Sequence, residues 1–194
     1  MTALVVAALA EEVAHIRDVE VLVTGVGKAV AAAGLARRLA VEPRPDLVVN
    51  VGTAGALDAS ATGLHEVGFV TQHDFPYAAI EVLAGPVDRG YLLHPGRPPQ
   101  PVRDWPRSLV AVATGDMFVA DAERAKAIAE TGVHLVDMEA FAYAATCAAF
   151  GVPLRCVKAV SDVADADAGM SWLDTIDACA VALADWVNRH ILSP

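Results

Sequence analysis

Short apolar runs alternate with longer amphipathic segments along this chain. Several runs are too uniformly apolar for a sheet with one face in water, so we expect strands that are covered on both faces. The predicted strands are Ala3–Leu9, Val19–Thr24, Leu47–Val51, Val67–Gln72, Leu109–Thr114 and Leu154–Val160. Helix-forming residues with periodic apolar positions predict helices at Lys28–Val41, Asp121–Thr131, Met138–Phe150 and Trp172–Ile191. The pattern predicts an α/β fold in which one sheet lies between two layers of helices.

Two features bear on the domain organisation. Residues 95–106 contain five prolines, which suit neither a helix interior nor a central strand, so we predict a surface loop there. The chain has 194 residues, of which 55% are hydrophobic, and this is enough to bury a sizeable core in one unit. We therefore expect a single domain over residues 1–194.

The charge balance limits the choice of partners. The chain carries 14 basic and 24 acidic residues, a formal net charge of -10, which repels the phosphate backbone of nucleic acids. The composition therefore argues against a nucleic-acid partner.

The cysteines and the first residues indicate the compartment. Cys147, Cys156 and Cys179 lie in apolar stretches without CxxC spacing, which is typical of buried free thiols in a reducing environment. The apolar residues 3–10 are too few to span a bilayer, and Glu11 and Glu12 follow where a signal peptide has its cleavage site. We expect a soluble, cytoplasmic protein that does not bind a membrane.

Two glycine motifs are candidate binding loops. Residues 24–28 read T-G-V-G-K after a predicted strand, but a dinucleotide fingerprint would have its third glycine at position 30, where this chain has Val30. A phosphate-binding P-loop would have its first glycine where Leu22 stands and a serine or threonine where Ala29 stands. A tight strand-to-helix turn is the simpler interpretation. Residues 50–56 read N-V-G-T-A-G-A, and their small side chains would let a ligand approach the backbone, although a simple turn is also compatible with them.

Three carboxylates stand in informative positions. Asp162 follows an apolar strand, at the edge where open α/β sheets bind ligands, whereas Glu12 and Glu139 stand near predicted element ends. Each taken alone could be a cap or a complement to a helix dipole. The spacing of Asp162, Asp165 and Asp167 invites a calcium interpretation, but it lacks the glycine and terminal glutamate of an EF-hand loop. We predict no metal site.

The motifs, taken in order, resemble one known superfamily. They are A-L-A-E-E-V at residues 8–13, G-V-G-K at 25–28, N-V-G-T-A-G at 50–55, T-G-D-M-F-V at 114–119, V-D-M-E-A at 136–140 and A-V-S-D-V-A-D at 159–165. This order is similar to that of the purine nucleoside phosphorylase and nucleosidase superfamily, and within it to the methylthioadenosine/S-adenosylhomocysteine nucleosidases. The resemblance implies a three-layer α/β/α sandwich around a mixed, mostly parallel sheet, with no cofactor.

The resemblance also implies a purine nucleosidase with three acidic residues in its site. Asp162 would protonate N7 of the departing purine, a role that requires a carboxyl group able to hold its proton near neutral pH. Glu139 would bind the ribose hydroxyls and Glu12 would activate the water that attacks the sugar. The other implied contacts are Met138 on the sugar, Phe118 stacked on the purine, backbone groups of Val119 on its edge, Thr53 and Gly55 near the water and base, and Trp172 at the 5′ substituent.

Alternatives to this function stay open at the level of sequence. Related phosphorylases bind phosphate with an arginine before the glycine loop, where this chain has Asn50, so hydrolysis is favoured over phosphorolysis. The substrate could be methylthioadenosine, S-adenosylhomocysteine, futalosine or an unmodified purine nucleoside. A non-catalytic nucleoside sensor with the same fold is an alternative of another class, and an NAD-dependent dehydrogenase is a distant third.

Two segments depart from the family pattern. Between Arg17 and Val21 the chain lacks a hairpin that related nucleosidases insert, and residues 77–108 are shortened and proline-rich. The resemblance implies a homodimer whose partner subunit helps to build the 5′ pocket, so these departures bear on substrate range and assembly.

Overall fold

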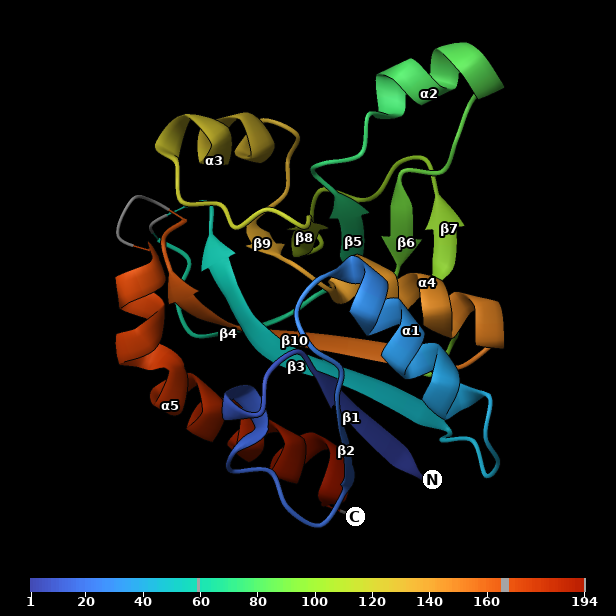
Figure 1. The fold of residues 1–194 in the computed structure, drawn as a ribbon, viewed down its shortest axis with the longest axis vertical. Helices are drawn as coiled ribbons and strands as arrows, with labels where there is room; N and C mark the ends of the chain where they lie inside the picture. Colours follow the sequence, from blue (N-terminus) through green and yellow to red (C-terminus); the bar gives the residue numbers. More distant parts are fainter. Residues whose placement is uncertain (59, 165–167, 194) are drawn as a thin grey trace.

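A computed structural model describes residues 1–58, 60–164 and 168–193 of the chain. Ten strands in these residues form one mixed sheet, with helices packed on both faces (Figure 1). The strands are β1 (Ala3–Ala7), β2 (Glu20–Val23), β3 (Leu47–Ala56), β4 (Leu64–Glu66), β5 (Phe69–Gln72), β6 (Gly90–Leu92), β7 (Gln100–Val102), β8 (Ala111–Thr114), β9 (Leu135–Asp137) and β10 (Leu154–Asp162). The helices are α1 (Lys28–Leu39), α2 (Tyr77–Ala84), α3 (Ala122–Ala129), α4 (Ala140–Phe150) and α5 (Ala168–Val187), with a 3₁₀ turn at Glu11–Val13 and a π-helical turn at Asn188–Leu192.

The long strand β3 holds the sheet together. It pairs in parallel with β1 on one side and with β10 on the other, and its last two residues pair antiparallel with β9. From β9 the sheet continues through β8, β5, β6 and β7, while β2 lies outside β1. The parallel ladders of β1, β3 and β10 direct the carboxyl ends of these strands to the same edge of the sheet.

Alternating side chains of β1 explain the three layers. Leu4 and Val6 are buried with residues of α1 and α4, whereas Val5 and Ala7 are buried with residues of α5. Successive residues of a strand point to opposite faces, so an unbroken apolar strand requires cover on both sides. Figure 1 shows α5 on one side of β1, β3 and β10, with α1 and α4 on the other. The predicted α/β/α sandwich is confirmed.

The predicted elements all exist, but several of their limits were wrong. Residues 50–56 were interpreted as a loop, but they continue β3 to Ala56. Their glycines, Gly52 and Gly55, leave room for side chains that approach the strand. The proline-rich stretch, predicted as a loop, contains the short strand β7, where Pro101 is tolerated because β7 lies at the edge of the sheet. The last helix, α5, begins at Ala168, before the predicted start at Trp172.

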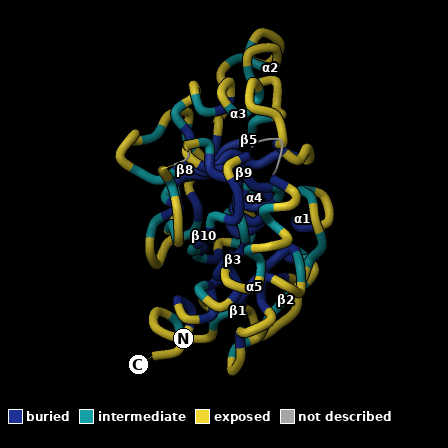
Figure 2. Tube along the Cα trace, turned by 90° about the vertical axis from the view of Figure 1, so that its left-hand side faces the viewer, coloured by how far each residue is buried: buried dark blue, intermediate teal, exposed yellow. Residues whose placement is uncertain are grey.

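The part of the molecule around α2 differs from the rest. This helix has no buried residue, and Val82 and Leu83 are 84% and 83% exposed. Figure 2 shows α2 as an exposed element at one end of the molecule. Within the described residues, no helix combines the length and the apolarity needed to cross a lipid bilayer.

We predict that the core contact of α5 can be measured with two leucines of the same helix. Leu183 is 0% exposed between α5 and the sheet, whereas Leu173 is 62% exposed. Leu183→Ala should lower the free energy of unfolding by about 2–5 kcal/mol, because it removes buried methyl groups and leaves a cavity. Leu173→Ala should change it by less than about 1 kcal/mol, since surface substitutions have small effects. Equal losses in urea denaturation would contradict the layer arrangement.

Candidate active site

A cavity of about 330 Å³ opens where five strands end. Its walls come from the ends of β3, β9 and β10, from the segments that follow β1 and β8, from Val26 before α1 and from the start of α5. This is the edge at which open α/β sheets commonly bind ligands. All nine residues predicted from the sequence line it: Glu12, Thr53, Gly55, Phe118, Val119, Met138, Glu139, Asp162 and Trp172.

Glu12 reaches the cavity because the 3₁₀ turn after β1 folds its side chain back over the strand end. Its Oε2 accepts hydrogen bonds from the amides of Ala8 and Leu9, both at 3.1 Å. Its Oε1 accepts from the amide of Thr53 at 2.8 Å and from the Thr53 hydroxyl at 3.0 Å. Glu12 is only 4% exposed, so these four donors replace water around its carboxyl group. Glu12 is therefore held firmly at one side of the cavity.

Thr53 connects Glu12 to the last helix. The indole Nε1 of Trp172 donates to Thr53 Oγ1 at 3.0 Å. The hydroxyl of Thr175 donates to the carbonyl oxygen of Ser161 at 2.9 Å and thereby ties α5 to the end of β10. Trp172 therefore lines the cavity beside Thr53, on the Glu12 side.

Asp162 is the last residue of β10, at the position expected from the sequence. A shift in the pairing register with β3 falls between Val160 and Asp162 and marks an irregularity just before it. Its Oδ2 accepts a hydrogen bond from the Ser161 hydroxyl at 2.8 Å, and its Oδ1 accepts one from the Ala164 amide at 2.9 Å. A Cβ at Gly55 would lie 2.9 Å from Oδ1, so glycine at this position makes room for the carboxyl group.

The calcium interpretation involved Asp162, Asp165 and Asp167. Asp165 and Asp167 lie outside the described residues. Among the residues that are described, no group of three or more histidine, cysteine or acidic side chains could hold a metal ion.

A buried ion pair lies behind the cavity. Lys158 Nζ is 2.8 Å from Asp137 Oδ2, and both side chains are at most 2% exposed. Asp137 also accepts hydrogen bonds from the Thr114 hydroxyl at 2.6 Å and from the Ala140 amide at 2.9 Å. Burial acts to lower the pKa of Lys158, but the charge of Asp137 and smaller contributions from other neighbours keep it above the ordinary lysine value. The pair is therefore a charged, fully buried support for the cavity wall.

Glu139 stands beside this pair, at the start of α4. Its Oε1 accepts a hydrogen bond from the Gly27 amide at 2.8 Å, and the residue is 6% exposed. Burial raises the pKa of Glu139 to about 7, and the negative charge of Asp137 adds to the increase, while Lys158 and the Gly27 amide oppose it. Glu139 is thus a carboxyl group that changes its charge near neutral pH.

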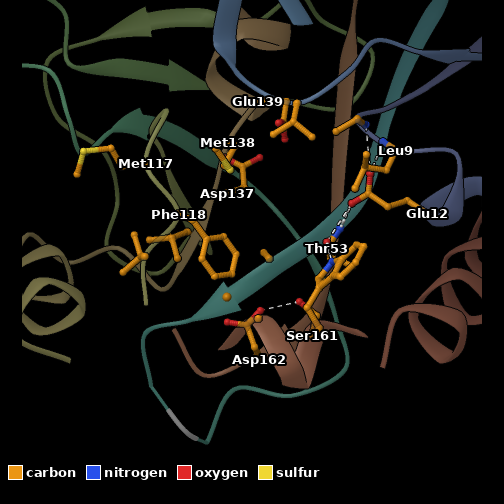
Figure 3. Close-up of a pocket in the computed structure, with 18 residues that line it drawn as sticks. Leu9, Glu12, Thr53, Met117, Phe118, Asp137, Met138, Glu139, Ser161 and Asp162 are labelled. Carbon is orange, nitrogen blue, oxygen red and sulfur yellow. Dashed lines mark hydrogen bonds between the residues drawn. The ribbon is translucent and has the colours of Figure 1, made fainter. Parts of the chain in front are cut away.

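The wall opposite Glu12 is apolar. Figure 3 shows Phe118 on one side of the cavity, Glu12 and Thr53 on the other, and Asp162 and Glu139 at two further edges. Phe118 is 53% exposed, whereas its neighbour Val119 is 5% exposed and packs in the core. A flat ligand placed against Phe118 would therefore face three carboxyl groups at once.

Sequence reasoning missed two members of the site. One is Lys158, whose place inside the apolar strand from Val157 to Val160 signals a buried counter-charge. The other is Asp137, whose carboxylate accepts a hydrogen bond from the Ala140 amide at the start of α4. Its pairing with Lys158 depends on the packing of two strands and had no local signal.

Comparisons with known proteins show which chains this one is similar to. The family model described as the phosphorylase superfamily matches residues 103–191. A methylthioadenosine/S-adenosylhomocysteine nucleosidase from Staphylococcus saprophyticus is 29% identical over 195 residues, covering 91% of this chain and 83% of the relative.

Solved structures share the fold over nearly the whole chain. A variant of the Helicobacter pylori nucleosidase with 5′-methylthioadenosine in its active site has a TM-score of 0.81 at 19% identity, covering 97% of this chain and 96% of that chain. The native structure of futalosine hydrolase from Helicobacter pylori has a TM-score of 0.80 at 18% identity, with 97% and 96% covered. The fold is that of the nucleoside phosphorylases and hydrolases. The resemblance to the purine nucleoside phosphorylase and nucleosidase superfamily, and within it to the methylthioadenosine/S-adenosylhomocysteine nucleosidases, is confirmed.

We predict that Glu139 makes the stability of the protein depend on pH. Its pKa is about 7 in the folded chain against an ordinary 4.5, so between these values the folded state holds a proton that the unfolded state has lost. This contribution is fully present below about pH 4.5 and is lost as the pH rises through about 7. The wild-type free energy of unfolding should therefore fall relative to that of Glu139→Gln across this range.

Urea denaturation at several pH values measures this difference. The exposed Glu123→Gln on α3 serves as the control and should show no such trend. A difference between wild type and Glu139→Gln that stays constant from pH 4.5 to 7 would contradict the prediction.

Proposed function

We propose that this chain hydrolyses the N-glycosidic bond of a purine nucleoside and releases the free base. The observation that carries the proposal is the presence of Asp162, Glu139 and Glu12 around one cavity of about 330 Å³. Three carboxyl groups at separate edges can act on the base, the sugar and the attacking water of a single ligand.

Departure of the base is the first requirement. A purine leaves its sugar poorly as an anion, so a proton delivered to N7 as the bond breaks lowers the barrier. Asp162 is the proton donor in this proposal, with its carboxyl group oriented by Ser161 and the Ala164 amide. Phe118 lies where it can stack on the purine plane and hold N7 toward Asp162.

The sugar comes next. As the base leaves, the ribose develops positive charge, which a nearby carboxylate stabilises, and hydroxyl contacts fix its position. Glu139, held beside Gly27, accepts hydrogen bonds from the ribose hydroxyl groups, and Met138 packs against the ribose ring. The charged form of Glu139 is the better acceptor for two hydroxyl groups.

Attack by water completes the reaction. Glu12 lies across the cavity from Phe118 and takes the proton of a water molecule that approaches the anomeric carbon. Its two oxygens already accept four hydrogen bonds, about as many as a carboxylate can accept. Three of these four donors are backbone amides, which cannot rotate. The fourth is the hydroxyl group of Thr53, which can rotate away from Glu12 and make room for the water.

Water is favoured over phosphate as the nucleophile. No arginine or lysine is among the described residues that line the cavity, whereas four acidic residues are. Asn50, at the position where phosphorylases carry an arginine, is 1% exposed, and its amide nitrogen donates to carbonyl oxygens of β1 and β3. A phosphate ion would therefore meet negative charge without a compensating donor.

The substrate class follows from the relatives. The similar nucleosidases are named for methylthioadenosine and S-adenosylhomocysteine, and a structural neighbour is named for futalosine. We propose a nucleoside of this kind, with its 5′ substituent near Trp172, which lines the cavity from α5. The shortened residues 77–108 bear on which 5′ group fits.

We also propose a cytoplasmic homodimer in which residues 1–194 form one catalytic domain. Three buried free cysteines suit a reducing compartment. Val82 and Leu83 on α2 are exposed apolar side chains of a kind that a second copy of the chain could cover.

Base release should not depend on phosphate. Incubation with methylthioadenosine, S-adenosylhomocysteine, futalosine, adenosine and inosine, each with and without phosphate, should release free base from at least one nucleoside at equal rates in both conditions. Chromatography of the base gives the rate. A strict requirement for phosphate would indicate phosphorolysis, and tight binding without any release would indicate a sensor.

Replacing the proposed acid should remove most of the activity. Asp162→Asn keeps the size of the side chain but cannot deliver the proton, so kcat should fall by roughly 10²–10⁴-fold. Asp174→Asn, an exposed aspartate on α5, is the matched control and should keep wild-type rates. Thermal melts establish that both variants fold. Wild-type turnover by folded Asp162→Asn would mean that another group supplies the proton.

A further inference from the structure

A second cavity, of about 990 Å³, lies apart from the first. It is bounded by the end of β5, the start of α2, α3 and the segment after β7. None of the residues that line it lines the first cavity. Met117, Phe118 and Val119, between β8 and α3, line the first cavity, whereas Ala113 of β8 and residues of α3 line the second.

The second cavity has the opposite charge to the rest of the protein. Four of the 14 basic side chains of the chain line it, against two acidic ones, Asp104 and Glu130. The chain as a whole carries a formal net charge of -10. A local excess of guanidinium groups on an acidic protein creates a region that attracts anions. The four arginines are Arg89, Arg103, Arg107 and Arg124.

Two of these arginines are engaged within the protein. Arg89 forms an ion pair with Glu81 at 2.8 Å. Arg107 donates to the carbonyl oxygen of Thr131 at 2.6 Å, and its guanidinium lies 3.9 Å from the ring centre of Trp105. These contacts explain the positions of Arg89 and Arg107 without a ligand.

The other two arginines form no ion pair in the part of the chain that the structure describes, although Arg103 adds to the larger effect of Arg89 in lowering the pKa of Glu81. Within the described residues, the side chain of Arg103 makes no hydrogen bond or ion pair, and the guanidinium of Arg124 makes one hydrogen bond, to the sulfur of Met117 at 3.7 Å. A guanidinium carries five N–H donors in a planar fork that matches the oxygens of a phosphate group. Arg103 and Arg124 therefore present unused donors to the same cavity.

A third unused polar group points to the same ligand. Both ring nitrogens of His73 are buried and have no hydrogen-bond partner among the described residues. The ring lies under Gly115, where an added Cβ would come within 2.2 Å of it, so its position is set by packing. Burial lowers the pKa of His73, although the charge of Asp74 opposes this, so the ring is a neutral donor and acceptor. Buried polar groups are normally paired, and one that lines a cavity is suited to a polar ligand.

We propose that this second cavity binds a phosphate group, either free or carried by a small phosphoester, through Arg103, Arg124 and His73. Two guanidinium groups balance the charge of about −2 of a phosphate at neutral pH, and its oxygens can accept from all three side chains. Phe75, 39% exposed at the same cavity, offers an apolar surface to the organic part of a phosphoester. The site is independent of the proposed hydrolysis, because the two cavities share no lining residue.

Titration calorimetry at constant ionic strength tests the proposal with four probes: inorganic phosphate, pyrophosphate, ribose 5-phosphate and ribose. At least one phosphate-bearing probe should bind saturably at one site per chain, whereas ribose should not bind there. Tighter binding of ribose 5-phosphate than of phosphate identifies a phosphoester as the ligand, and the reverse order identifies the free ion. Either order supports the site.

Variants assign the binding to this cavity. Arg103→Gln and Arg124→Gln should each weaken binding of the phosphate-bearing probe by about tenfold or more, because each removes charged hydrogen bonds. Arg97→Gln, an exposed arginine outside the cavity, removes the same net charge and should leave the affinity unchanged. Absence of saturable binding in the wild type, or equal weakening by all three substitutions, overturns the proposal. Base release by the wild-type protein is measured separately, so either proposal can fail alone.

Discussion

The buried ion pair between Lys158 and Asp137 is the interaction on which the site depends. Lys158 lies in the middle of β10 and Asp137 at the end of β9, and both side chains are at most 2% exposed. Taking both charges out of water is costly, and this cost is offset only when the pair is close and its other donors and acceptors are satisfied. Thr114 of β8 and the Ala140 amide of α4 supply those further contacts. One pair thus ties three strands and a helix together behind the cavity.

The same pair sets the electrostatics of the neighbouring carboxyl groups. Asp137 adds to the burial that raises the pKa of Glu139 to about 7, whereas Lys158 opposes it. Gly52 lies between Lys158 and Glu12, where a Cβ would come within 3.3 Å of the lysine nitrogen and 3.0 Å of a carboxyl oxygen. Glycines at positions 52 and 55 of β3 therefore let Glu12 and Asp162 approach one strand closely. The small residues of this motif thus belong to a strand, and they make room for the side chains of the protein that pack against it.

The charged side chains that line the two cavities differ in sign. Four acidic residues and no arginine or lysine are among the described residues that line the first, whereas four arginines and two acidic residues line the second. Met117, between β8 and α3, lines the first cavity and contacts Arg124, which lines the second. The first cavity suits a neutral nucleoside whose sugar develops positive charge during the reaction, and the second suits a small anion.

The sequence by itself determined the long elements and the order of the site residues. Continuous apolar runs predicted buried strands and hence two helical layers, and the strand before Asp162 predicted its place at a carboxyl end, because hydrophobic periodicity is a local property of the chain. It did not reveal the three-residue strands β4, β6, β7 and β9, which are too short to show a period, nor the helix α2, which buries no residue.

Only the tertiary structure decided which polar groups meet. The Gly27 amide contacts Glu139 across 112 positions of sequence, and Lys158 finds Asp137 through the packing of separate strands. The arginines of the second cavity come from three separate segments of the chain, and their individual positions carry no signal of a common site. Contacts of this kind depend on how segments that are distant in the sequence pack together. The pattern of residues within one segment does not show which other segment it will contact.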